Sequence, residues 1–188
     1  ERNPLWVERG VFGSLALKKN GTLLELACGD GFNTKHFYSE IANRVVACDF
    51  DKSAIKTAKK KNSVSNIDFV VADIRTEMPD GRFDNIVFDA AIEHFTPTEI
   101  HSIMKGIKSR LLPEAVLSGY TLVEKGQGEK FIPQHEYEFK DMNDLKRFLT
   151  PYFGNVKVFE TIYPSRHNLY FWDSDAVLPF DKEWAHMS

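Results

Sequence analysis

Apolar residues along this chain follow two different spacings. Short runs rich in Val, Ile, Leu and Phe have the length of strands. Between these runs, apolar residues recur every three or four positions, as they do on one face of a helix. We expect seven strands, at Thr22–Ala27, Arg44–Asp49, Ile67–Ala72, Phe83–Asp89, Ala115–Glu124, Asn155–Tyr163 and His167–Asp173.

Residues with helix-capping chemistry stand where the helical segments begin. Thr96-Pro97-Thr98-Glu99 predicts a helix start, because threonine caps, proline fits the first turn and glutamate closes a capping box. Asp51 precedes a segment that carries apolar residues inward and lysines outward. We expect helices over about Pro4–Leu17, over Asn33–Ala42 with Asn33 as its cap, from Asp51 onward, from Thr96 to about Leu112, and over Asp141–Tyr152.

The order of these elements predicts the fold class. Strands that alternate with helices are typical of βαβ units and a mostly parallel sheet. Only Pro164-Ser165-Arg166 joins the last two strands, whereas a parallel pair needs a crossover of roughly a dozen residues, so these two must be antiparallel if they are neighbours. We therefore expect an α/β fold: a doubly wound, seven-stranded, mostly parallel sheet with an antiparallel last strand and helices on both faces.

The length of 188 residues fits one domain. The chain has no internal repeat, low-complexity segment or long linker, so we expect a single domain over residues 1–188. Residues 1–20 would form an N-terminal helical cap whose apolar face covers the sheet. Residues 125–140 would form a substrate loop, because a long loop in an otherwise compact chain is more often a binding loop.

Composition and charge narrow the classes of function. The net charge of −3 disfavours a chain that holds nucleic acid by its phosphates. Two cysteines, Cys28 and Cys48, are too few for a disulfide framework. No apolar stretch approaches the roughly 20 residues of a membrane span and no signal peptide opens the chain, so we expect a cytoplasmic location without a membrane partner. The chain starts at Glu1 without a methionine, and we expect a trimmed or processed N-terminus.

A glycine turn and an acidic residue suggest a ligand site. Gly29-Asp30-Gly31 connects the first strand to a helix, and glycine lets a backbone approach a ligand closely. Open α/β sheets bind ligands in the crevice at the carboxyl ends of their strands. Asp49 lies eighteen residues beyond Gly31, near the spacing at which an acid accepts hydrogen bonds from a ribose diol. The alternative is that Asp49 only caps the following helix, although Asp51 suits that role as well.

Acidic residues recur at or near the ends of four consecutive predicted strands. They are Glu25, Asp49, Asp73 and Asp89. In a parallel sheet these ends converge on one edge, where several carboxylates would repel one another without a cation or hydrogen-bond donors. A ligand with an ammonium, a sulfonium, a ribose diol and an adenine amino group supplies both.

The segment Glu25–Gly31 resembles the first motif, acidic-x-Gly-x-Gly-x-Gly, of the Rossmann-like (class I) S-adenosylmethionine-dependent methyltransferase superfamily. The resemblance extends over nearly the whole chain and includes a terminal antiparallel strand. Two departures stand out, because Ala27 occupies the first glycine position and Asn33 stands beyond the last.

The resemblance implies S-adenosylmethionine as cofactor, S-adenosylhomocysteine as its product and a role for each motif residue. Asp49 would hold the ribose, with Phe50 beside the adenine and Asp73 and Ile74 at the adenine amino group. Asp89 would line the methionine end, and Gly29 and Gly31 would pack beside the methionine part. Glu25 and Ala27 are the remaining residues that the resemblance assigns to cofactor binding.

A dinucleotide-dependent dehydrogenase is the main competitor. Such an enzyme needs a third glycine and binds a pyrophosphate at the helix N-terminus. Here Glu25 and Asp30 crowd that region with negative charge, and the third glycine is missing. The sequence therefore favours the methyltransferase.

Two histidines are candidate catalytic bases. Methyl transfer from a sulfonium mainly requires alignment of donor and acceptor, but a hydroxyl acceptor must also lose its proton. His94 follows the fourth strand and His135 lies late in the long loop. Their alternatives are that Glu93 and His94 order the loop or cap the next helix, and that His135 is a solvated loop residue. Tyr120, Arg166 and His167 are further candidates for the acceptor pocket; Arg166 suits a carboxylate or phosphate, or a surface salt bridge.

The acceptor class leaves alternatives open. Glu93, His94 and His135 match three metal ligands of methyltransferases that act on small-RNA 3′ ends, but Ala90 replaces the fourth, so we expect no metal. A non-catalytic, cofactor-binding subunit also fits. Because the chain has no large insertion, we expect an enzyme with a small-molecule acceptor, such as a sugar or other metabolite, and O- or N-methylation.

Overall fold

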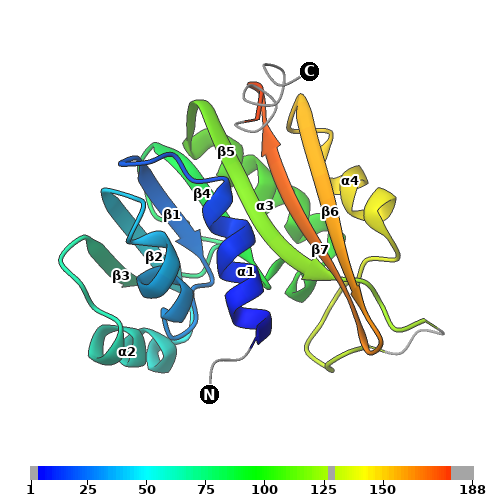
Figure 1. Ribbon diagram of the computed structural model, residues 1–188, viewed down its shortest axis with the longest axis horizontal. Helices are drawn as coiled ribbons and strands as arrows, with labels where there is room; N and C mark the ends of the chain where they lie inside the picture. The colour runs from blue at the N-terminus through cyan, green and yellow to red at the C-terminus, as the bar shows by residue number, and fades with distance from the viewer. Residues whose placement is uncertain (1–3, 127–129, 179–188) are drawn as a thin grey trace.

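The computed structural model describes residues 4–126 and 130–178 (Figure 1). Within them, seven strands form one sheet in the order β3-β2-β1-β4-β5-β7-β6. The first five strands pair in parallel, and β7 runs antiparallel to both β5 and β6. The predicted fold class is confirmed. The strands are β1 Thr22–Leu26, β2 Arg44–Asp49, β3 Ile67–Val71, β4 Phe83–Asp89, β5 Leu111–Leu122, β6 Asn155–Tyr163 and β7 Arg166–Ser174.

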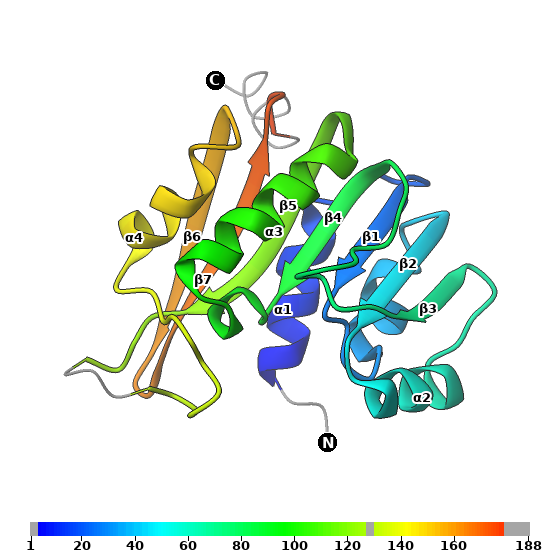
Figure 2. The ribbon, with the colours of Figure 1, turned by 180° about the vertical axis from the view of Figure 1, so that it is seen from behind.

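Helices cover both faces of the sheet. Figures 1 and 2 show α1 and α2 on one face and α3 and α4 on the other. The Thr96–Glu99 capping box is present, and Asp51 caps α2 by accepting a hydrogen bond from the Ser53 amide. The predicted helix starts at Thr96 and Asp51 are thus confirmed. The helices are α1 Pro4–Leu15, η1 Thr34–Tyr38, α2 Lys52–Lys61, η2 Ile92–His94, α3 Pro97–Arg110 and α4 Met142–Leu149.

The segment after the glycine turn differs from the prediction. Instead of a regular helix capped by Asn33, it forms the short π-helix η1, in which the Ser39 amide bonds to the Thr34 carbonyl. Asn33 has helical backbone angles and makes no capping bond. Its side-chain amide instead donates to Asp89 at 3.3 Å, while the Thr34 hydroxyl donates to Glu25. The π-helical register therefore places Asn33 and Thr34 within hydrogen-bonding distance of these two acids. Short π-helical turns are frequent at functional sites.

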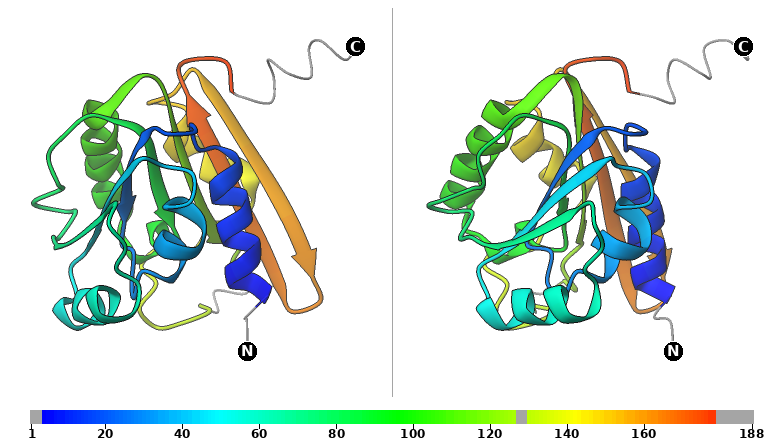
Figure 3. Two further views of the ribbon diagram at one scale, coloured as in Figure 1. Left: turned by 60° about the vertical axis from the view of Figure 1, so that its left-hand side comes forward. Right: turned by 90° about the vertical axis from the view of Figure 1, so that its left-hand side faces the viewer.

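Helix α1 packs closely on η1 because two of its residues, Gly10 and Gly13, lack side chains. A Cβ atom on Gly10 would lie 2.4 Å from the Phe37 ring, and one on Gly13 would lie 2.8 Å from the Tyr38 hydroxyl. Figure 3 shows α1 running along the face of the sheet beside β5 and β7. This close approach brings Trp6 and Arg9 to the edge of the sheet where the predicted ligand site lies.

The apolar cores lie between the sheet and its helices. One cluster packs residues of the central strands against α3 and α4, and a second packs them against η1 and α2. Among the described helices, none has the length and hydrophobicity that a membrane crossing requires. Residues 1–3 of the predicted cap, residues 127–129 of the predicted loop and residues 179–188 of the predicted domain lie outside the described residues.

Candidate active site

Two cavities meet at the carboxyl ends of the parallel strands. The first has a volume of about 360 Å³ and the second about 440 Å³. Both are lined by Ala27 and Ala90, so they are two halves of one cleft. The first is lined also by Trp6, Arg9, Glu25, Cys28, Gly29, Asp30, Phe32, Asn33 and Asp89, and the second by Asp49, Phe50, Ala72, Asp73, Ile74, Arg75, His94, Phe95 and Gln134.

The turn after β1 opens its backbone to the first cavity. Ala27, Gly29 and Gly31 all have positive φ, at 56°, 57° and 75°. A Cβ atom on Gly29 would meet no protein atom within 4 Å, whereas one on Gly31 would lie 2.5 Å from the Phe69 ring. Gly29 therefore leaves room for a ligand. Gly31 lines neither cavity and serves close packing instead.

Asp49 ends β2, and its carboxylate connects the turn after β1 to the turn before α2. Its side chain is 8% exposed, and its carboxylate accepts from the Gly29 and Asp51 amides, both at 2.9 Å. Asp51 itself caps α2, so Asp49 is not needed as the helix cap. Each carboxylate oxygen has two acceptor positions, which leaves capacity for ligand hydroxyls. Phe50, 70% exposed, lines the same cavity.

Asp73 lies just beyond β3 and is already paired. The Arg75 guanidinium donates to its two oxygens at 2.9 and 2.7 Å, and these bonds hold the pKa of Asp73 below its usual value. Ile74 is buried beside it, and all three residues line the second cavity. A ligand amino group would share this carboxylate with Arg75.

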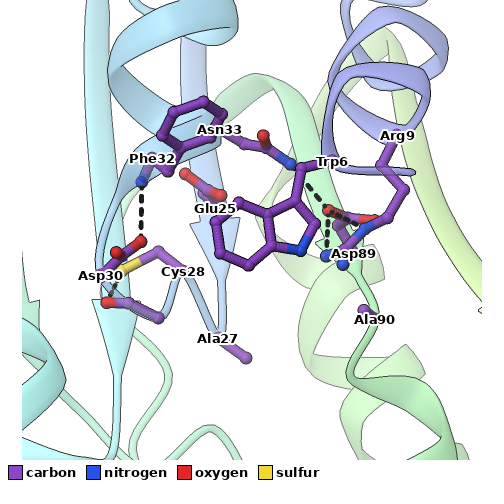
Figure 4. Close-up of a pocket in the computed structure, with 11 residues that line it drawn as sticks. Trp6, Arg9, Glu25, Ala27, Cys28, Asp30, Phe32, Asn33, Asp89 and Ala90 are labelled. Atoms are coloured by element: carbon purple, nitrogen blue, oxygen red, sulfur yellow. Dashed lines mark hydrogen bonds and ion pairs between the residues drawn. The ribbon is translucent and has the colours of Figure 1, made fainter. Parts of the chain in front are cut away.

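Asp89 ends β4 and binds two residues that the sequence analysis did not select. The Arg9 guanidinium donates from Nε and Nη2, with a shortest distance of 2.7 Å, and Asn33 donates from its amide. Arg9 and Asn33 both point toward Asp89 in Figure 4. Burial opposes the charge of Arg9, but Asp89 raises its pKa above the ordinary value. Because 80 residues separate Arg9 from Asp89, no local sequence signal could have joined them.

The first cavity holds polar groups that suit a cation. Glu25 is 4% exposed, and burial raises its pKa to about 8 although Thr34 donates to it at 2.5 Å. The side-chain oxygen of Asn33 is buried with no hydrogen-bond partner. A ligand ammonium would bond to both groups and would stabilise the ionised form of Glu25.

Three candidate residues come together beside the second cavity. One ligand atom each from Glu93, His94 and His135 can be chosen so that all lie within 4.8 Å of one another. The two imidazole rings meet edge to face, with centroids 4.8 Å apart. Glu93 accepts from the Thr121 hydroxyl at 2.9 Å, and burial raises its pKa. The long loop thus returns to the end of β4.

The surroundings of the two histidines differ from a solvated loop. His135 is 3% exposed, so the alternative of a solvated histidine is wrong. Its Nδ1 contacts the Glu138 carboxylate, while Nδ1 of His94 lies 3.3 Å from the Gln134 carbonyl oxygen. His94, unlike His135, lines the second cavity.

The remaining acceptor-side candidates do not share one environment. Tyr120 is buried next to Arg9, whose guanidinium carbon lies 5.0 Å from the ring centroid. Arg166 donates to the Tyr120 hydroxyl, and His167 pairs with Glu160 at 2.8 Å. His167 is therefore part of the contact between β6 and β7, whereas Tyr120 and Arg166 adjoin the cleft.

Comparisons with known proteins agree with this geometry. Residues 23–114 match the model of a family described as a methyltransferase domain. A putative methyltransferase, 235L, of Invertebrate iridescent virus 6 is 35% identical over 150 residues, which are 73% of this chain and 56% of that protein. The malonyl-[acyl-carrier protein] O-methyltransferase of Bacillus anthracis is 24% identical over 159 residues, covering 77% of this chain and 58% of that protein. The chain thus spans somewhat more than half the length of these relatives.

Solved structures show the same fold. The N-methyltransferase NodS from Bradyrhizobium japonicum WM9 superposes with a TM-score of 0.74 at 18% identity, covering 91% of this chain and 96% of NodS. NodS in complex with S-adenosyl-L-homocysteine gives a TM-score of 0.67 at 15% identity, over 90% of this chain and 85% of that one. The strand order, the glycine turn, the strand-end acids and these matches lead to one conclusion: the chain belongs to the Rossmann-like, class I superfamily of S-adenosylmethionine-dependent methyltransferases.

Proposed function

We propose that this protein transfers a methyl group from S-adenosylmethionine to a small-molecule acceptor. The observation that carries the proposal is the two-part cleft, in which Gly29 leaves open space and an acid follows each of β2 and β3. The cleft lies at the carboxyl edge of the sheet, where open α/β folds bind their ligands.

The two cavities divide the cofactor between them. In the first, Ala27 and Gly29 would lie beside the methionine moiety, with its ammonium between Glu25 and Asn33. Asp89, held by Arg9, would line the same end. In the second, Asp49 would accept from the ribose hydroxyls, and the adenine would lie against the residues Phe50, Asp73 and Ile74.

The cofactor supplies a methyl group on a positively charged sulfur, an already activated leaving group. The protein therefore has to align the acceptor and exclude competing water. His94 is the proposed base, because it lines the cleft. His135, edge-on against His94 and bonded to Glu138, would orient that imidazole.

The relatives differ in what they methylate. Their names give an O-methyltransferase acting on a malonyl group in one case and an N-methyltransferase in another. We propose O- or N-methylation of a sugar or other metabolite for this chain. The two cavities measure about 360 and 440 Å³ and the chain has no large insertion, which supports a small acceptor.

A metal-dependent reaction, as in RNA 2′-O-methylation, is the second candidate. One ring nitrogen of each histidine already faces an oxygen acceptor, Glu138 for His135 and Gln134 for His94. Metal-bound histidines usually donate their other ring N–H to such a carboxylate or carbonyl. Against it, Ala90 offers no ligand and the net charge is −3. Calorimetry with Mg²⁺, Mn²⁺ and Zn²⁺ tests this candidate, with Glu93→Gln as the matched variant.

Turnover tests the proposed function. Incubation with S-adenosylmethionine and pools of sugars, amines and acids should give a product heavier by one methyl group and equal amounts of S-adenosylhomocysteine. A protein that binds the cofactor yet modifies none of these acceptors would instead be a non-catalytic, cofactor-binding subunit.

A further inference from the structure

A group of cationic and aromatic side chains gathers beside the cleft where three segments meet. Lys125 follows β5, Phe131 lies in the loop before α4, and Arg166 begins β7. The Lys125 ammonium lies 4.7 Å from the centroid of the Phe131 ring, and the Arg166 guanidinium carbon lies 5.9 Å from it. We call these three residues the Arg166 cluster. Figures 1 and 2 show that the loop and the β6–β7 turn lie at the same end of the sheet.

Among the described residues, the hydrogen-bond acceptors that hold the Arg166 side chain are neutral groups. Its Nη2 and Nε donate to the Tyr120 hydroxyl at 2.5 and 3.1 Å, and Nε also donates to the Asn168 side-chain oxygen at 2.9 Å. In residues 4–126 and 130–178, no carboxylate forms an ion pair with Arg166 or with Lys125. A surface salt bridge therefore does not account for Arg166 in this part of the chain.

The nearest acid network is occupied by other donors. Glu8 accepts from Asn168, and also from three hydroxyl groups on β6 and β7, those of Thr161, Tyr163 and Tyr170. These bonds satisfy its carboxylate and lower its pKa despite partial burial. The guanidinium of Arg166 is linked to this network through the neutral amide of Asn168.

Contacts connect the Arg166 cluster to both halves of the cleft. Tyr120 lies between Arg166 and Arg9, and Arg9 lines the first cavity. On the other side, the Phe131 amide donates to Glu138 at 2.7 Å, and the same carboxylate contacts His135, which packs on His94. The cluster is therefore one contact removed from Arg9 through Tyr120, and it is linked to His94 through Glu138 and His135.

Given the proposed methyltransferase function, we infer that the Arg166 cluster binds an anionic group, a carboxylate or a phosphate, on the methyl acceptor. A planar guanidinium fixed by two hydrogen-bond acceptors is preorganised for such a group, and a second cation adds to the attraction. The anion would give Arg166 the charged partner that the described residues do not supply. One end of the acceptor would thus be held while its reacting atom lies toward His94.

Titration with simple anions tests this site without knowledge of the acceptor. The protein is first saturated with S-adenosylhomocysteine, and sodium acetate or sodium phosphate is then added at constant ionic strength, with sodium chloride as balance. We expect saturable shifts of the Arg166 Nε–H and Phe131 amide NMR signals. Binding of acetate alone would identify a carboxylate site, and binding of phosphate alone a phosphate site.

Variants decide whether Arg166 is responsible. Arg166→Gln should weaken anion binding at least tenfold, and Lys125→Gln by a smaller factor. Arg82→Gln, at an exposed arginine before β4, is the matched control and should change nothing. Saturable binding that is equal in Arg166→Gln, or no binding of either anion, would overturn the inference. Failure of S-adenosylhomocysteine to bind in the first step would instead contradict the proposed function.

Discussion

The two sides of the cleft are built from the chain in different ways. The cofactor side uses residues that end or follow consecutive parallel strands, such as Gly29, Asp49 and Asp73. The acceptor side instead joins Tyr120 of β5, His135 of the loop before α4 and Arg166 of β7, which are far apart in sequence. A sheet edge fixes the first group through strand order alone, whereas the second depends on how helices and loops pack.

This difference shows which part of the site defines the family and which part defines the individual protein. The sheet edge binds a ligand by backbone and strand-end acids, so any chain with this topology can retain it. Loops and added helices vary more freely, and they place side chains that recognise a particular acceptor. The cleft therefore supports a statement about the cofactor, and the acceptor side supports one about specificity.

We expect the largest effect on activity from the loss of His94, which lines the cleft where the cofactor side and the acceptor side meet. If it accepts the acceptor's proton, His94→Ala should lower turnover by about 100-fold, the usual contribution of a positioned base. The affinity for S-adenosylmethionine should stay the same, because His94 acts on the acceptor. His167→Ala, in the β6–β7 contact, is the control. Full turnover in His94→Ala would show that His94 is not a base and that the enzyme aligns donor and acceptor without it.

The next effect concerns the open space at Gly29 on the cofactor side. Gly29 and Gly126 both have positive φ, and a Cβ atom on either would meet no atom of the described residues within 4 Å. Alanine strains both backbones alike, by roughly 1–2 kcal/mol. Only Gly29→Ala would also fill ligand space, which should weaken cofactor binding by about tenfold to hundredfold. Equal affinities of the two variants in calorimetry would show that no ligand approaches Gly29.

Proton release on ligand binding shows whether Glu25 in the first cavity is protonated before the ligand binds. Burial raises the pKa of Glu25 to about 8, so the empty site holds mostly the protonated acid at pH 7. A bound ammonium would lower this pKa, and binding should release up to about one proton per site. Calorimetry in two buffers with different ionisation enthalpies measures the number. Glu25→Gln should lose the release; unchanged release in that variant would assign the proton to another group.

The smallest expected effect concerns the stability of the fold and a buried acid, Asp173, that lies outside the cleft. Unlike Glu25, it lines neither of the two cavities. Asp173 on β7 is fully buried, both its oxygens lack a hydrogen-bond partner, and burial raises its pKa well above the ordinary value. Asp173→Val should therefore stabilise the fold by about 1–3 kcal/mol in denaturant unfolding.

The raised pKa of Asp173 also fixes how the free energy of unfolding changes with pH. Above the ordinary pKa of Asp173 the unfolded chain releases a proton that the folded chain keeps, so the free energy of unfolding of the natural protein falls as pH rises. The free energy of unfolding of Asp173→Val should therefore exceed that of the natural protein by more at higher pH. Asp173→Asn should remove the pH dependence but keep an unsatisfied polar group. A difference between the natural protein and Asp173→Val that does not change with pH would contradict the burial of an unpaired acid.

Much of the cofactor side could be predicted from sequence, because its signals are local. Hydrophobic runs locate β2 and β4 at their observed limits, and strand-end acids such as Asp49 follow directly. The π-helix after the turn could not be predicted, since it depends on where Asn33 and Thr34 find partners in Asp89 and Glu25.

The acceptor side was only partly accessible to sequence reasoning. His94, Tyr120 and Arg166 were selected by residue type, whereas Arg9 and Trp6, which line the methionine end of the cofactor side, were not assigned to the site. Their place in the first cavity depends on the packing of α1, where glycines at two positions permit close approach to η1. Such a long-range contact has no periodicity or spacing that a single sequence displays.

Calorimetric binding of S-adenosylmethionine, S-adenosylhomocysteine and NAD tests the central claim most directly. The strand-end acids and the glycine turn should bind the first two ligands and not the third, because negative charge crowds the region where a pyrophosphate would lie. We predict saturable binding of both S-adenosyl compounds with one site per chain and no heat from NAD. Binding of NAD without binding of either S-adenosyl compound would contradict the proposed function.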